Sequence, residues 1–111
     1  YFELKDGGYL DTGTYKWDQP AQSAYRTYAG NGYSPAGSGR DPITYLSYEN
    51  GESIHAKGKY VIDTGAGGTI IWLLNYGYTY TRPDGKRGTN TLLADVKCAF
   101  LQRNCPGPMT P

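Results

Sequence analysis

Aromatic side chains are the residues of this sequence best suited to recognition chemistry. Trp72 stands in an apolar run, Trp17 is followed by Asp18, and Tyr48 and Tyr76 lie near the ends of further apolar or aromatic stretches. A flat ring matches the apolar C–H face of a pyranose, with a contact worth about 1 kcal/mol beyond simple burial. The same rings can instead fill a core, so both readings stay open for each of these four residues.

Histidine and cysteine are the other residues that could do chemistry. His55 is the only histidine, and no second His or Cys stands near it at ligand spacing, so we expect a surface residue and no metal site. Cys98 and Cys105 lie at the end of an expected helix, close enough for a disulfide that would hold the C-terminal tail, although two separate thiols remain possible. A disulfide would indicate an extracellular or periplasmic protein.

A helix is expected at about 52–64. Ser53 can serve as its N-cap, Ile54, Val61 and Ile62 recur on one face, and Gly65 can end it in the left-handed conformation. Gly58 falls on the apolar face at a cost of roughly 1 kcal/mol relative to alanine. This cost predicts that another backbone approaches closely at Gly58.

The run 69–74, Thr-Ile-Ile-Trp-Leu-Leu, is apolar on both faces, which predicts a parallel strand covered on both sides. In the following segment Tyr76, Tyr78 and Tyr80 alternate on one face. A final helix should begin at Asn90 or Thr91. Its apolar stripe should consist of Leu92, Val96, Ala99 and Phe100.

The first half of the chain reads as strands and turns. We expect the end or a short turn of helix at 1–5, short strands between 9 and 28, an exposed Gly- and Pro-rich loop at 29–42 and a strand at 43–48. The sequence therefore predicts a β-rich segment followed by helix, strand and helix.

Length and composition limit the fold. The chain has 111 residues, whereas a complete (β/α)8 barrel needs about 250. Hydrophobic residues make up 38%, so the 12 Tyr should supply much of a small core rich in phenolic hydroxyls. With 11 basic and 10 acidic residues and no long run of either sign, nothing indicates a nucleic-acid or anionic-membrane partner. No apolar stretch of about 20 residues and no leader is present, so neither a membrane span nor an intact signal peptide is expected.

Seven short motifs follow one another along the chain. They are Tyr1 with Glu3, Gly7-Gly8, Trp17-Asp18 with Tyr25, Leu46-Ser47-Tyr48, Ser53-Ile54 with Lys57, Gly67-Gly68, and Trp72. In this order the chain resembles the C-terminal segment of glycoside hydrolase family 18, chitinase-like, over about its first hundred residues.

The resemblance implies an α+β or partial α/β fold: the C-terminal portion of a (β/α)8 barrel with a Tyr-rich α+β insertion, not a complete barrel. Residues 1–48 would belong to the insertion, 49–105 would form the last helix, strand and helix, and 106–111 would be a tail. It also implies that Trp72 forms the floor of a cleft for chitin or a related glycan, with Tyr48, Trp17 and Tyr76 as further substrate-binding candidates.

The family's catalytic motif, Asp-x-x-Asp-x-Asp-x-Glu, has no counterpart among the ten acidic residues. No catalytic residue and no cofactor are therefore expected, and hydrolysis would need the upstream chain of the same barrel. Two other functions remain open. One is a stand-alone carbohydrate-binding module, and the other is an inactive interaction protein that keeps the hydrolase shape.

Overall fold

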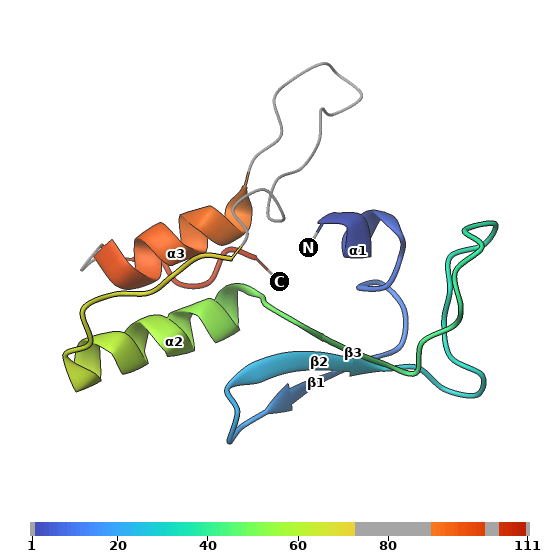
Figure 1. Ribbon diagram of the computed structural model, residues 1–111, viewed down its shortest axis with the longest axis horizontal. Coiled ribbons are helices and arrows are strands. Elements are labelled where there is room, and N and C mark those ends of the chain that lie inside the picture. The colour runs from blue at the N-terminus through green and yellow to red at the C-terminus, as the bar shows by residue number, and fades with distance from the viewer. Residues whose placement is uncertain (1, 73–89, 102–104, 111) are drawn as a thin grey trace, which may run out of the picture. The chain divides into compact units, whose positions relative to one another are not determined.

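The computed structural model describes residues 2–72, 90–101 and 105–110. These residues form an α+β structure with three helices and one three-stranded antiparallel sheet, and they contain no complete barrel. The chain divides into two compact units, Tyr1–Tyr48 and Glu49–Pro111, which are described separately below (Figure 1).

The first unit contains one short helix and the sheet. Its elements are α1 (Phe2–Asp6), β1 (Thr14–Asp18), β2 (Ser23–Thr27) and β3 (Tyr45–Tyr48). The strands pair in the order β1-β2-β3, both pairs antiparallel, with Trp17 opposite Ala24 and Ala24 opposite Tyr48. The predicted strands between 9 and 28 and at 43–48 are confirmed. The predicted loop is interrupted by one isolated bridge, Tyr33 to Ile43.

Tyrosines form the core of the first unit, as the composition predicts. The rings of Tyr28 and Tyr33 are stacked with centroids 5.7 Å apart, and the Tyr9 ring meets both edge-on. The Tyr28 hydroxyl donates to the Tyr9 carbonyl at 2.7 Å, and the Tyr33 hydroxyl donates to the Gly7 carbonyl at 3.0 Å. Burial raises the pKa of the Tyr28 phenol above its ordinary value of 10.0. Each phenol thus adds apolar area and also satisfies a backbone acceptor after α1.

The second unit begins with α2 (Gly51–Thr64), close to the predicted 52–64. The N-cap is Asn50, not Ser53: the Asn50 side chain accepts from Ser53 N at 3.0 Å, and the Ser53 hydroxyl accepts from Asn50 N at 3.0 Å. This reciprocal capping box places Ser53 inside the first turn, so the predicted cap was three residues too late. Gly65 ends the helix with φ 66°, as predicted.

The second helix of this unit, α3 (Thr91–Leu101), packs beside α2. Both helices run in the same direction, because His55 and Gly58 on α2 face Asp95 and Ala99 on α3 in the same order (Figure 1). A Cβ added at Gly58 would lie 2.8 Å from the Ala99 carbonyl oxygen, which confirms the predicted close approach. Ile62, one turn further along α2, is exposed and so is not part of the packed face.

The α3 helix starts after Asn90, whose side chain accepts from Leu93 N at 2.9 Å, as expected of a cap. Its most buried residues are Asp95 and Cys98, whereas the predicted apolar stripe of Leu92, Val96, Ala99 and Phe100 is only half-buried. The contact between the two helices is therefore more polar than the stripe predicted.

The predicted strand at 69–74 is not observed in its described part. Residues 69–72 form no strand, and 73 and 74 lie outside the described residues. The described strands pair only with one another, so the backbone of 69–72 has no neighbouring strand, and a β-strand exists only through such pairing. The apolar run also predicted burial, but residues 69–72 are exposed, so this prediction was wrong for the described part of the run.

Candidate functional site

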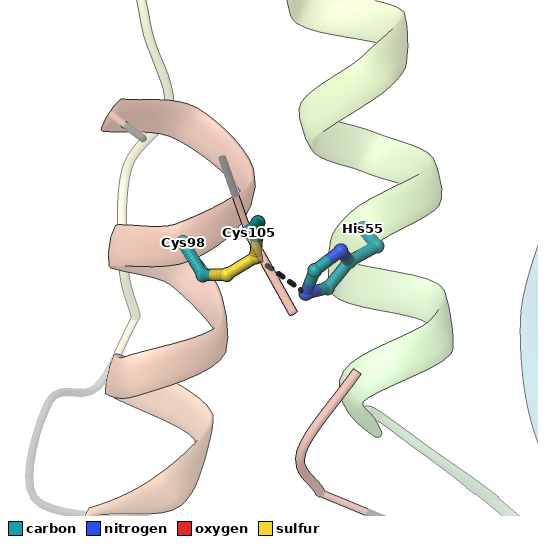
Figure 2. Close-up of side chains that lie close together, drawn as sticks. All are labelled: His55, Cys98 and Cys105. Atoms are coloured by element: carbon teal, nitrogen blue, oxygen red, sulfur yellow. Dashed lines mark hydrogen bonds between the residues drawn. A yellow bond between two sulfur atoms is a disulfide. The ribbon is translucent and has the colours of Figure 1, made fainter. Parts of the chain in front are cut away.

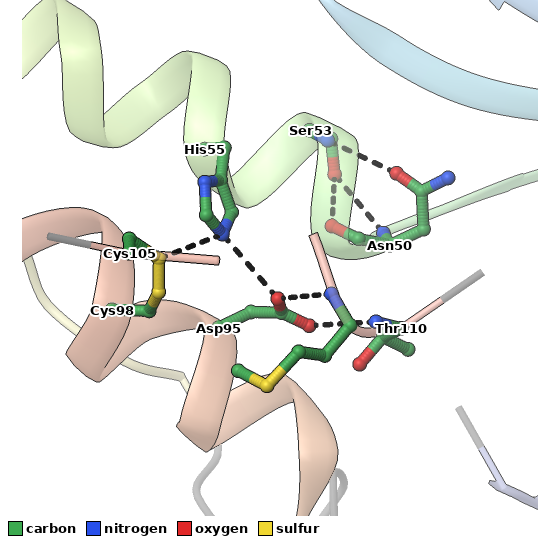
Figure 3. A network of polar contacts seen from close by, with 8 residues as sticks. Asn50, Ser53, His55, Asp95, Cys98, Cys105 and Thr110 are labelled. Atoms are coloured by element: carbon green, nitrogen blue, oxygen red, sulfur yellow. Dashed lines mark hydrogen bonds and ion pairs between the residues drawn. A yellow bond between two sulfur atoms is a disulfide. The ribbon is translucent and has the colours of Figure 1, made fainter. Parts of the chain in front are cut away.

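A buried carboxylate organises the second unit. The Asp95 side chain is fully buried on α3, and its two oxygens accept from Met109 N at 2.8 Å and from Thr110 N at 3.0 Å (Figure 3). The Thr110 carbonyl in turn accepts from Gly51 N at 2.7 Å. One carboxylate thus holds the C-terminal tail against the start of α2.

His55 lies beside this carboxylate. Its Nε2 is 3.4 Å from Asp95 Oδ1, and its side chain retains only 21% of its exposed area. The prediction of a surface histidine without partners was wrong, because the partners come from α3 and the tail. Asp95 follows His55 by 40 residues. The spacing patterns that mark metal ligands or proton relays apply to residues on the same helix or strand, so they could not identify this pair.

The structure joins Cys98 and Cys105 in a disulfide, with their Cα atoms 5.4 Å apart. Cys98 is buried on α3 and Cys105 is half-buried in the tail. The Cys105 sulfur lies 4.0 Å from His55 Nε2 (Figure 2), so the imidazole edge contacts both the disulfide and Asp95 (Figure 3). We name these four residues, His55, Asp95, Cys98 and Cys105, the imidazole–disulfide cluster.

A second polar group lies at the start of α2. The Ser53 hydroxyl donates to Glu49 Oε2 at 2.7 Å, and Glu49 also pairs with Lys57. Lys59 pairs with Asp63 at i, i+4, as expected of a solvated helix face. These contacts stabilise α2.

Two of the predicted substrate-binding residues share one face of the sheet. Trp17 on β1 and Tyr48 on β3 are both paired with Ala24, and directly paired residues project to the same side. Tyr15, two residues before Trp17, projects to that side as well. Trp17 and Tyr48 are half-buried, and the Trp17 indole N–H donates to Gln19 Oε1 at 3.1 Å. We name Tyr15, Trp17 and Tyr48 the aromatic face.

Trp72 belongs to the other unit and is 85% exposed, and Ile70 before it is 89% exposed. Tyr76, the fourth predicted residue, lies outside the described residues. The structure therefore brings Trp17 and Tyr48 onto one surface and leaves Trp72 as an exposed indole in an apolar segment.

No protein-family model matches this sequence, and no curated protein or solved structure matches it either. Among residues 2–72, 90–101 and 105–110, every helix is too short or too polar to cross a bilayer. The functional argument therefore depends on the residues and their geometry.

Proposed function

We propose that this chain is the C-terminal segment of a chitinase-like glycoside hydrolase of family 18, which acts on β-1,4-linked N-acetylglucosamine polymers. In this proposal residues 1–48 belong to the small insertion, 49–105 to the last helix, strand and helix of the barrel, and 106–111 to the tail. The upstream strands supply the catalytic acid, Trp72 supplies a sugar-stacking floor, and the enzyme is secreted.

The exposure of an apolar segment carries the proposal. Ile70, Ile71 and Trp72 follow one another in a run without a polar side chain, yet all three are exposed. Contiguous apolar surface of this kind usually marks the place of a partner. Strands of an upstream barrel portion would cover these residues and pair their backbone, turning 69–74 into the buried strand that its composition predicts.

The direction of the two helices supports the same proposal. Short connections between neighbouring helices give antiparallel pairs, whereas a helix–strand–helix unit gives parallel ones because the strand returns the chain. Here α2 and α3 are parallel, and the segment after α2 runs back along them (Figure 1). That path is the one a barrel strand would take between two barrel helices.

A chimera tests the proposal. The corresponding C-terminal segment of an active family 18 chitinase would be replaced by this chain, and hydrolysis of chito-oligosaccharides would be followed. We expect activity above that of the same chimera carrying Gln in place of the host's catalytic Glu. In the active chimera, Trp72→Ala should lower kcat/KM by roughly tenfold, corresponding to about 1.4 kcal/mol of transition-state stabilisation.

The matched control is Tyr60→Ala, which removes an exposed aromatic ring from α2 outside the proposed floor. It should leave kcat/KM unchanged. A soluble chimera with native circular dichroism that hydrolyses no faster than its Gln variant would contradict the proposal. Equal effects of Trp72→Ala and Tyr60→Ala would contradict the assignment of the floor.

The aromatic face favours a second candidate, a carbohydrate-binding module without catalysis. Trp17 and Tyr48 flank the small Ala24 across three strands, which allows two rings to stack along one oligosaccharide. This function predicts that the isolated chain binds chitohexaose in a calorimetric titration and that Trp17→Ala abolishes the heat of binding. If the isolated chain does not bind chitohexaose and the chimera is active, the carbohydrate-binding module without catalysis is excluded.

A further inference from the structure

Three atoms that can bind a metal ion converge in the imidazole–disulfide cluster. His55 Nε2 and the sulfurs of Cys98 and Cys105 all lie within 4.8 Å of one another (Figure 2). Zinc binds imidazole nitrogen at about 2.0 Å and thiolate sulfur at about 2.3 Å, so tetrahedral ligands stand on the order of 3.5 Å apart. Small side-chain movements would therefore suffice to place all three atoms around one ion.

The oxidised cluster cannot use its sulfurs in this way, because each is bonded to the other and neither is a thiolate. Reduction changes this. A phosphine reductant takes the oxygen of one water molecule and becomes the phosphine oxide, while the two hydrogens of that water end on the two sulfurs as the S–S bond breaks. A divalent metal that then binds both sulfurs releases these two protons to solvent.

The two thiols should stay together after reduction, because the tail has other tethers. Asp95 accepts from Met109 N and Thr110 N, and Thr110 O accepts from Gly51 N. These three bonds hold the tail against α2 and α3 independently of the disulfide. Cys105 therefore stays opposite Cys98. Folding has then already restricted the conformations of the ligand side chains, so little further conformational entropy is lost when a metal ion binds.

The surroundings also favour a cation. The Asp95 carboxylate lies 3.4 Å from the His55 nitrogen and is fully buried, so its charge is weakly screened there. Its oxygens accept from the tail amides, so a water molecule would have to supply the fourth ligand of a tetrahedral ion at this place. Two thiolates and an imidazole form a soft donor set, which selects zinc over magnesium or calcium.

We propose that the reduced chain binds one Zn²⁺ through His55 Nε2 and the sulfurs of Cys98 and Cys105, so that disulfide and zinc are alternative states of one site. The zinc state would withhold both thiolates from oxidation, and disulfide formation would expel the metal. This inference does not depend on the hydrolase proposal, because it concerns only α2, α3 and the tail.

Cobalt is the probe for this site because tetrahedral Co²⁺ is coloured and zinc is not. The 111-residue chain would be reduced with a phosphine under nitrogen, freed of reductant and titrated with Co²⁺. We expect tetrahedral d–d bands and a sulfur-to-cobalt charge-transfer band that saturate at one equivalent and disappear on addition of one equivalent of Zn²⁺. The oxidised chain should show neither band.

Variants identify the ligands. Removal of even an outer-shell partner costs roughly 10–100-fold in metal affinity, so His55→Asn and Cys98→Ser should each weaken Co²⁺ binding by more than about 100-fold. Asp63→Asn, on the exposed face of α2, is the matched control and should bind like the parent. Far-ultraviolet circular dichroism of each reduced variant checks that α2 and α3 persist.

Absence of tetrahedral bands in the reduced parent would overturn the proposal, as would parental affinity in a folded His55→Asn variant. X-ray absorption of the zinc-loaded parent gives a test that needs no variant. Two sulfur ligands and one imidazole nitrogen would support the site, and any other sulfur count would refute it.

Discussion

Replacing Asp95 by Asn tests how the second unit is held together. The carboxylate accepts two backbone N–H groups, and a hydrogen bond to a charged acceptor contributes roughly 1.5–3 kcal/mol. Asn keeps one oxygen and turns an N–H₂ group toward the other donor, so one bond is lost and the other is weakened. We expect a loss of about 2 kcal/mol in the free energy of unfolding, or roughly a 30-fold higher opening constant.

Amide hydrogen exchange measured by NMR reports this loss locally. With the disulfide intact, the protection of the Met109 and Thr110 amides should fall first and furthest, and that of the buried α2 amides should follow. Asp63→Asn makes the same chemical change in an exposed pair with Lys59, which contributes only about 0.3–0.5 kcal/mol. Equal losses in the two variants, or unchanged protection at Met109 and Thr110 in Asp95→Asn, would refute the reasoning.

Three further changes test other parts of the structure. Gly58→Ala should destabilise the helix pair by about 1–3 kcal/mol in a urea titration, because its Cβ would meet the Ala99 backbone, and a net gain from helix propensity would contradict this. Tyr28→Phe should cost about 1 kcal/mol by leaving the Tyr9 carbonyl without its donor. The pKa of Tyr28 is raised in the folded state, so its stabilising contribution is complete below the unfolded pKa of about 10 and falls as pH rises through the folded pKa. The fall of Tm at alkaline pH should therefore be smaller in Tyr28→Phe than in the parent. An equal fall in the two proteins would argue against this contribution of Tyr28. Trp72→Ala should shift stability by less than about 0.5 kcal/mol, since the indole is exposed, and a larger drop in Tm would show hidden packing.

Local signals predicted the local structure well. The bounds of α2 follow from residues within one or two turns, and the cap at Gly65 follows from its freedom to adopt positive φ. Close approach at Gly58 was also predictable, because a glycine on an apolar helix face needs a packing reason. The cap assignment failed by three residues, because Asn50 and Ser53 can both cap a helix and only the reciprocal hydrogen bonds decide between them.

Contacts between residues far apart in the sequence were not predicted, for a different reason. The neighbours of His55 lie on another helix and in the tail, and only the parallel packing of α2 and α3 brings Asp95 and Cys105 to it. Periodicity assigned the apolar stripe of α3 to Leu92, Val96, Ala99 and Phe100, which are only half-buried. Asp95 is fully buried instead, because its carboxylate pairs with backbone donors of the tail. No pattern in the residues around Asp95 predicts that backbone N–H groups of the tail will bind its carboxylate.

The described residues of the second unit bury more polar than apolar side chains. Among the described residues of this unit, the buried polar side chains are Asp95, Ser53, Asn50 and Thr110, and the buried apolar ones are Ile54 and Cys98. A pair of short helices with so little apolar burial depends on caps, tail hydrogen bonds and a disulfide, as small domains usually do. Meanwhile Ile62, Ile70 and Trp72 remain in water. Burial of those three side chains by neighbouring strands would add roughly 1.5–3 kcal/mol each, comparable to one hydrogen bond to the Asp95 carboxylate. The hydrophobic effect thus favours an association that covers 69–72, and the chimera tests whether a hydrolase barrel provides it.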